Sequence, residues 1–168
     1  MRRFALALIV VMLTLSYVQI SLAAPQPAFR DLCWGDPPEK LGVTTVFDGK
    51  EFDLPGIEVR IKASEDMQLG PLTANMILYG FFKNRLTMVF ILANDPKMLS
   101  QIARAKYGEP QNSNMFMIDE LYIRGDTTCA VKEDIFDKTG YMMLASTAIV
   151  LEYNQWQKEQ AEEASKAF

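Results

Sequence analysis

Few side chains in this sequence could carry out catalysis, and histidine is absent from all 168 positions. Without histidine the chain has no Ser-His or Cys-His nucleophilic pair and lacks the usual general base at neutral pH. Its two cysteines are too few for a four-cysteine zinc site, and no glycine-rich phosphate-binding loop is present. We therefore expect a protein that is not an enzyme and that holds no cofactor and no metal ion.

Carboxylates are the groups left that could support chemistry. Asp48, Glu51 and Asp53 fall in one turn region, and Asp134 with Asp137 in another. Oxygen ligands from a loop suit calcium, but neither cluster has the full spacing of a known calcium loop. Asp is also favoured in turns for backbone reasons. We interpret both clusters as solvated turns, and a carboxylate-based enzyme is the weakest functional hypothesis.

The two cysteines, Cys33 and Cys129, could form a disulfide if the chain is exported, because disulfides persist outside the cytosol. Such a bridge would close a loop of about a hundred residues and contribute up to ~4.7 kcal/mol in the chain-entropy model. Two separate buried thiols are the alternative, since free cysteine packs as a small hydrophobic residue. The sequence leaves the disulfide and the two free thiols equally open.

The first residues have the features of a secretory signal peptide. Two arginines precede an apolar run from Phe4 to Leu15, and Ser21-Leu22-Ala23 places small residues three and one positions before a cut. We predict a signal peptide over residues 1–23, a periplasmic or secreted location, and no membrane span after cleavage. An uncleaved N-terminal membrane anchor is the alternative, because the stretch 4–24 is long enough to cross a bilayer.

The charge balance argues against nucleic acid as a partner. Removing Arg2 and Arg3 with the leader leaves 15 of the 17 basic residues against 21 acidic ones, a net charge of −6. Phosphate binding depends on clustered Lys and Arg, which this balance disfavours. Nearly half of the residues are apolar, so a sizeable core can form.

The most distinctive stretch, Ala74 to Ala93, is typical of a β-hairpin. Two apolar runs flank Lys83-Asn84-Arg85, and Asn84 tolerates the positive φ of a tight turn. Both runs are apolar at nearly every position, which favours strands covered on both faces. We therefore place this hairpin in the middle of a sheet.

The remaining pattern predicts an α+β fold, in which an antiparallel sheet carries helices packed on one face. Asp36 and Asp95 are predicted N-caps of helices that Gly42 and Gly108 end. A capped helix before about three strands in each half suggests a duplicated α-β-β-β unit. We expect a linker at 24–28, one α+β domain at 29–153 and a polar C-terminal helix at 154–168. The predicted strands outside the hairpin are 43–47, 57–63, 120–124, 127–134, 141–145 and 148–153.

Several short motifs resemble a group of small exported bacterial proteins of unassigned function. They are Phe29-Arg30, Trp34-Gly35, Asn84-Arg85-Leu86 and Lys106-Tyr107-Gly108-Glu109-Pro110. A Trp often stands in that group where this chain has Tyr122. More distantly, a helix ending in Leu-Gly or Tyr-Gly before antiparallel strands is similar to periplasmic modules of the BamE/SmpA-OmlA type. That similarity implies a module that binds protein partners and carries no residue-level site.

Two functional hypotheses follow. The first is an exported, non-enzymatic interaction module that binds an envelope or secreted protein. The second is a binder of a small apolar ligand between sheet and helices, with Tyr79, Phe81, Phe82 and Phe90 as expected contacts. A closed apolar cavity would favour the ligand, whereas an exposed apolar patch on a filled core would favour the protein partner.

Overall fold

A computed structural model of the chain describes residues 26–111, 119–134 and 139–166. The predicted signal peptide therefore lies outside the described residues. The expected linker lies partly within them, and Pro27 and Ala28 belong to a short strand, β1 (Pro27–Phe29). Among the described residues, no helix is both long and apolar enough to cross a membrane.

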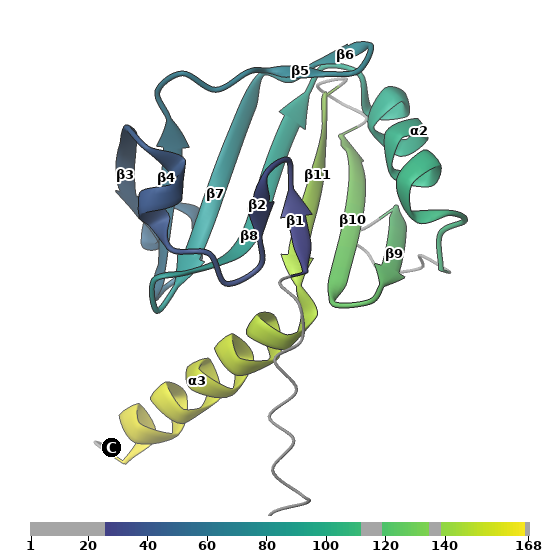
Figure 1. Cartoon of the computed structure of the whole chain (residues 1–168). Helices are drawn as coiled ribbons and strands as arrows, with labels where there is room; N and C mark the ends of the chain where they lie inside the picture. Colours follow the sequence, from purple (N-terminus) through teal and green to yellow (C-terminus); the bar gives the residue numbers. More distant parts are fainter. Residues whose placement is uncertain (1–25, 112–118, 135–138, 167–168) are drawn as a thin grey trace, which may run out of the picture.

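One antiparallel sheet of seven strands runs through the molecule, in the order β3-β4-β7-β8-β11-β10-β9 (Figure 1). The predicted α+β class with an antiparallel sheet is confirmed, while the duplicated unit stays a prediction. The sheet strands are β3 (Thr44–Asp48), β4 (Ile57–Lys62), β7 (Met76–Phe82), β8 (Arg85–Ala93), β9 (Glu120–Arg124), β10 (Thr127–Asp134) and β11 (Thr139–Ser146). The other elements are β2 (Leu32–Cys33), η1 (Pro38–Leu41), η2 (Gly49–Phe52), β5 (Gln68–Leu69), β6 (Leu72–Thr73), α2 (Pro96–Tyr107) and α3 (Thr147–Ser165).

The predicted hairpin is confirmed as β7 and β8, and β8 is the central strand of the sheet. Its turn is one residue shorter than expected, because Arg85 already belongs to β8. The turn residues Lys83 and Asn84 have φ values of 50° and 59°. Two successive positive φ angles match the right-handed twist of the strands that they join.

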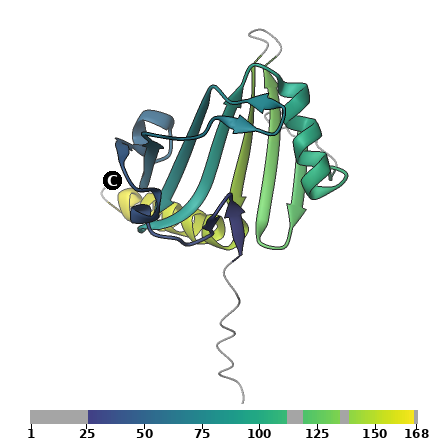
Figure 2. The same ribbon diagram turned by 45° about the horizontal axis from the view of Figure 1, so that its top comes forward.

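One face of the sheet, here called the covered face, is filled and closed. The side chains of Tyr79, Val89, Leu144, Cys129 and Tyr122 form a row across it, since these residues are register partners on neighbouring strands. All five are at most 1% exposed. The N-terminal hairpin β1–β2, the β5–β6 hairpin and α2 lie over this face (Figures 1 and 2).

Specific contacts hold these covering elements in place. The Phe29 ring packs on Tyr79, and the Tyr107 ring of α2 packs on Tyr122, both with centroids 6.3 Å apart. Trp34 Nε1 donates to Thr127 Oγ1 at 2.9 Å and links the N-terminal segment to β10. The motif residues Phe29 and Trp34 are therefore core residues of the covered face.

Helix α2 begins and ends as predicted. The Asp95 carboxylate accepts a hydrogen bond from the Met98 N–H (2.9 Å), Pro96 is the first helical residue, and Gly108 follows the last one with a φ of 88°. Proline at the first position and a residue in the left-handed region after the end are the expected helix boundaries.

The first predicted helix needs a correction. It is a single 3₁₀ turn, η1, and Asp36 does not cap it. The Asp36 carboxylate accepts hydrogen bonds from the Cys33 N–H (2.8 Å) and from Lys40 Nζ (2.7 Å). Burial raises the pKa of Asp36, but these two hydrogen bonds outweigh it and leave the pKa below its usual value.

The predicted strand over 148–153 is wrong, because those residues belong to α3. Ser146 Oγ accepts from the Ile149 N–H (3.2 Å), and Asp126 Oδ1 accepts from the Ala148 N–H (2.8 Å). Asp126 Oδ2 also accepts from Ser146 Oγ (2.7 Å), so one carboxylate from the β9–β10 turn caps the helix. Ile149 and Tyr153, one turn apart, are its buried residues.

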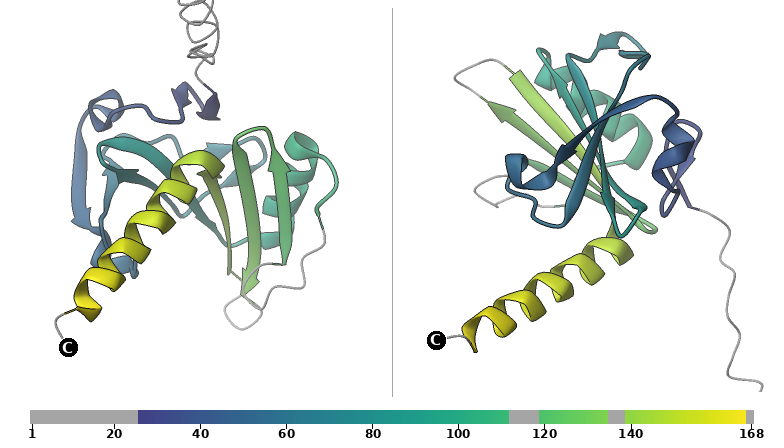
Figure 3. Two further views of the ribbon diagram at one scale, coloured as in Figure 1. Left: turned by 90° about the horizontal axis from the view of Figure 1, so that it is seen from below. Right: turned by 90° about the vertical axis from the view of Figure 1, so that its left-hand side faces the viewer.

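Helix α3 lies on the opposite side of the sheet from α2 and runs away from it (Figure 3). The Trp156 ring packs on Phe82 with centroids 5.6 Å apart, and the Tyr153 hydroxyl donates to the Pro55 carbonyl at 3.0 Å. A side chain at Gly56 would collide with Trp156, because a Cβ there would come within 2.5 Å of the indole ring. The two helices thus divide between the faces instead of sharing one.

Candidate functional site: an open apolar sheet face

The second face of the sheet, here called the open face, is apolar but only partly covered. A row of register partners crosses it: Leu78, Phe90, Met143, Ala130 and Leu121. Phe90, Met143 and Leu121 are half-buried, whereas the row on the covered face is fully buried. A partly exposed apolar row on a sheet whose other face is filled is a candidate interaction site.

A groove of about 470 Å³ lies at the centre of the open face. The Phe90 and Tyr141 rings stack within it, with centroids 4.8 Å apart and an interplanar angle of 26°. Asp53 is the only lining residue with a carboxylate. The lining residues come from the η2 region and four central strands: Phe52, Asp53, Leu54, Val59, Leu78, Gly80, Met88, Phe90, Tyr141 and Met143.

Gly80 gives the groove part of its shape. A Cβ at this position would lie 2.5 Å from Met88 Cγ and 3.2 Å from Ile57 Cγ2. Because Gly80 has no side chain, Met88 of the neighbouring strand β8 can occupy the space beside it. Methionine is flexible and polarisable, so this part of the wall can adapt to different occupants.

A second hollow of about 290 Å³ extends the groove toward α3. Leu54, Met88 and Met143 line both hollows, so the two adjoin. Val150 and Leu151 of α3 line the far end, and Leu151 is 64% exposed. The open face therefore offers an apolar depression from η2 to the first turns of α3.

Only one of the four predicted ligand contacts lies in this groove. Phe90 lines it, whereas Tyr79 and Phe81 are buried in the core, 1% and 3% exposed. Phe82 is 2% exposed and packs against Tyr153 and Trp156. The four residues therefore do not form a common site.

The sequence reasoning missed Tyr141, Met143 and Met88 as groove residues. Tyr141 and Met143 alternate with the buried Met142 and Leu144, so the two sets face opposite sides of β11. The alternation of side chains was readable from the sequence. Which of the two sets remains uncovered was not, because both are apolar.

Cys33 and Cys129 are free thiols and are not bonded to each other. Cys33 is half-buried on β2, and Cys129 is fully buried on β10. Burial raises the pKa of Cys129 to about 12, so this thiol stays protonated and unreactive at neutral pH.

Two residues of the first cluster, Asp48 and Asp53, have structural roles at the ends of η2. The Asp48 carboxylate accepts from the Lys50 N–H at 3.0 Å, and Asp53 ends η2 with a φ of 56°. Asp137 of the second cluster lies outside the described residues. Where the structure describes the chain, no three potential ligands gather into a metal site.

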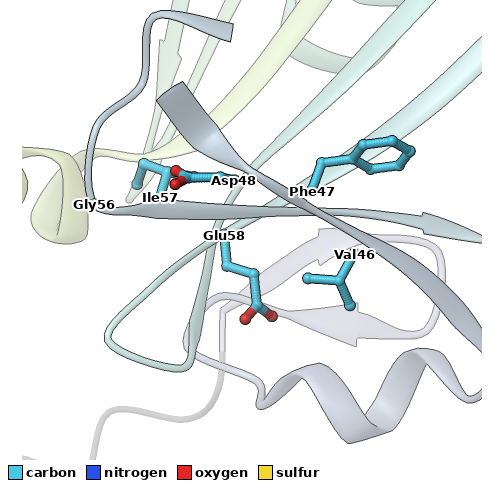
Figure 4. A pocket seen from close by; sticks show the side chains of 6 residues that line it. All are labelled: Val46, Phe47, Asp48, Gly56, Ile57 and Glu58. Carbon is cyan, nitrogen blue, oxygen red and sulfur yellow. The ribbon is translucent and has the colours of Figure 1, made fainter. Parts of the chain in front are cut away.

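A third hollow, of about 410 Å³, lies along β3 and β4 at the edge of the sheet. Figure 4 shows Val46 and Glu58 on one side of these strands and Phe47 on the other. Because its side chains diverge, this hollow does not gather groups around a ligand. The open face remains the strongest candidate site.

Comparisons with known protein families, with curated proteins and with solved structures gave no match.

Proposed function

We propose that this protein is an exported, non-enzymatic interaction module that binds a protein partner through the open face. The supporting observation is the contrast between the two faces of one sheet. The covered face is filled by the chain's own elements, whereas Phe90, Tyr141 and Met143 on the other face stay half-buried. Leaving such apolar area in water is costly, so a partner that covers it gains hydrophobic stabilisation.

The shape and chemistry of the groove indicate the kind of partner. Its walls are aliphatic, aromatic and methionine side chains, with Asp53 at the rim. Such a surface suits an element of an envelope or secreted protein that presents a ridge of apolar side chains. Specificity would come from fit and from polar groups around the rim.

Site-specific photo-crosslinking tests this proposal. A photoreactive residue replaces Met143 at the centre of the groove, and a control replaces Val43, which is 80% exposed outside it. The chain is expressed from residue 1 with its own leader. We expect a crosslink to one envelope or secreted protein from position 143 and none from position 43. Equal crosslinking from both positions, or none to any protein from position 143, would refute the proposal.

A charge substitution provides the matched functional test. Met143→Lys places an ammonium group in the groove, and Val43→Lys places the same group on an unrelated exposed position. We expect Met143→Lys to abolish capture of the crosslinked partner and Val43→Lys to leave capture unchanged. Far-UV circular dichroism confirms that both variants are folded.

A small apolar ligand is the second candidate, which the groove volume supports. About 470 Å³ falls within the ~300–1,000 Å³ typical of ligand pockets, and the stacked Phe90 and Tyr141 rings could contact a flat or acyl group. Organic extraction of the purified protein followed by mass spectrometry distinguishes the candidates. A stoichiometric lipid that is lost in Met143→Lys, together with no protein crosslink, would favour the ligand.

A further inference from the structure

Strand β3 forms one edge of the sheet, and part of its backbone has no partner within the described chain. The Ala63 N–H donates to the Val43 carbonyl at 3.0 Å, so Val43 turns its backbone toward β4. Backbone groups alternate in direction along a strand. Thr45 and Phe47 therefore also pair with β4, whereas Thr44 and Val46 direct their N–H and C=O groups outward.

The outer side of β3 lacks the features that usually block an edge strand. No proline, lysine or bulge interrupts β3, its one charged residue is Asp48 at the strand end, and Val46 is 51% exposed. The opposite edge differs, because the Gln111 N–H donates to the Leu121 carbonyl at 2.6 Å and covers part of β9. Of the two edges that the structure describes, β3 is the open one.

We propose that β3 pairs antiparallel with β3 of a second copy of this chain, with Val46 opposite Val46. This register is self-complementary, because an outward-facing residue lies at the centre of the strand. Val46 exchanges two hydrogen bonds with its copy, and Thr44 pairs with Asp48 of the other chain. The Asp48 carboxylates are therefore kept apart, and each lies opposite a threonine.

The charges beside the strand also fit a second copy. On β4, Arg60 donates to Glu58 Oε1 (2.5 Å) and to Thr44 Oγ1 (3.2 Å), so its charge is paired within its own chain. No unpaired cation or proline on β3 would oppose its copy. In an antiparallel pair the side chains of directly opposite residues point to the same side of the sheet, so the covered faces of the two copies lie on one side and their open faces on the other. Two open faces would thus join into one larger surface.

This pairing is expected to be weak and concentration-dependent. One strand pair buries less than the ~1,200 Å² of a standard stable interface. Sedimentation velocity of the full chain, expressed from residue 1 and purified after export, measures it. We expect a monomer–dimer equilibrium that moves to monomer in Val46→Pro, because proline removes the outward N–H but no bond to β4. Val46→Thr serves as the control and should still dimerise.

Cysteine scanning tests the register in a Cys33→Ser background. In the proposed pair, the Cα atoms of the two position-46 residues lie about 5.5 Å apart, so Val46→Cys brings the two cysteines within disulfide range. The two position-44 Cα atoms lie about 14 Å apart, because Thr44 of one copy is opposite Asp48 of the other and therefore four residues away from the other Thr44. Thr44→Cys thus leaves the two cysteines too far apart to bond. We expect a disulfide-linked dimer for Val46→Cys and little for Thr44→Cys. A monomer at every concentration, equal cross-linking at both positions, or cross-linking of position 46 to a different protein would overturn the proposal.

Discussion

At the scale of single residues, Arg30 pairs with a buried carboxylate beside the covered face. It lies in the turn between β1 and β2 with a φ of 57°, and its guanidinium forms an ion pair with Glu65. The Glu65 side chain is only 1% exposed and also accepts a hydrogen bond from the Tyr79 hydroxyl at 2.6 Å. A buried carboxylate is tolerated only when it is paired, so Arg30 is needed to hold Glu65 in place.

We predict that Arg30→Ala lowers the free energy of unfolding by about 3–5 kcal/mol, because it leaves a buried charge without its partner. Urea denaturation measures the change. Arg85→Ala removes an ion pair with the exposed Glu152 and should leave the urea midpoint almost unchanged, because water screens this pair. The free energy of unfolding should fall less in the double variant Arg30→Ala/Glu65→Ala than the falls in Arg30→Ala and Glu65→Ala added together. A loss below 1 kcal/mol for Arg30→Ala would contradict the role of this ion pair.

The two thiols should differ sharply in reactivity. We predict two alkyl adducts per chain under denaturing conditions without reductant, because Cys33 and Cys129 are not bonded. In the native protein only Cys33 should react quickly, since Cys129 is buried and its pKa is raised to about 12. Intact-mass measurement counts the adducts. No adduct without reductant and two after reduction would instead show a disulfide.

At the scale of elements, local signals predicted some boundaries and missed others. Helix α2 was predictable because Asp95, Pro96 and Gly108 act within the helix itself. The start of α3 was not, because a decisive cap, Asp126, precedes Ala148 by 22 residues and meets it only in the folded chain. The stretch 148–153 is a short apolar run that also fits a buried strand, and the distant Asp126 cap adds to the local Ser146 cap that starts the helix.

We predict that Asp126→Ala destabilises the protein by about 1–2 kcal/mol, as loss of a helix N-cap does. The substitution removes the acceptor of both the Ala148 N–H and Ser146 Oγ. Thermal melts followed by circular dichroism measure the effect. Asp31→Ala, at an exposed position, is the control and should leave the melting temperature unchanged. An equal effect of both substitutions would rule out the capping role.

At the scale of the whole molecule, the sequence could not distinguish the covered face from the open one. In β8, Val89 and Ile91 are fully buried, while the equally apolar Phe90 and Leu92 on the other face are half-buried. The hairpin was predicted to be covered on both faces for this reason. The difference arises from distant segments, since β1 and α2 both lie on one side.

Matched truncations on the two faces should therefore differ in cost. Ile91→Ala on the covered face should lower the free energy of unfolding by about 2–5 kcal/mol, as truncations in filled cores do. Met143→Ala on the open face should cost less, because this side chain is half-buried beside a groove. Denaturant titration measures both variants. Equal losses would mean that the open face is packed as tightly as the covered one.

The contacts that close the molecule join residues far apart along the chain. Trp34 Nε1 meets Thr127 Oγ1 across 93 positions, and the Tyr153 hydroxyl meets the Pro55 carbonyl across 98. Such distant pairings make folding slow, because long loops must close before the contacts stabilise them. The native state also cannot form until nearly the whole chain is present. In a nascent chain that ends before Thr127, the Trp34 indole lacks its hydrogen-bond acceptor. The covered face also lacks β10.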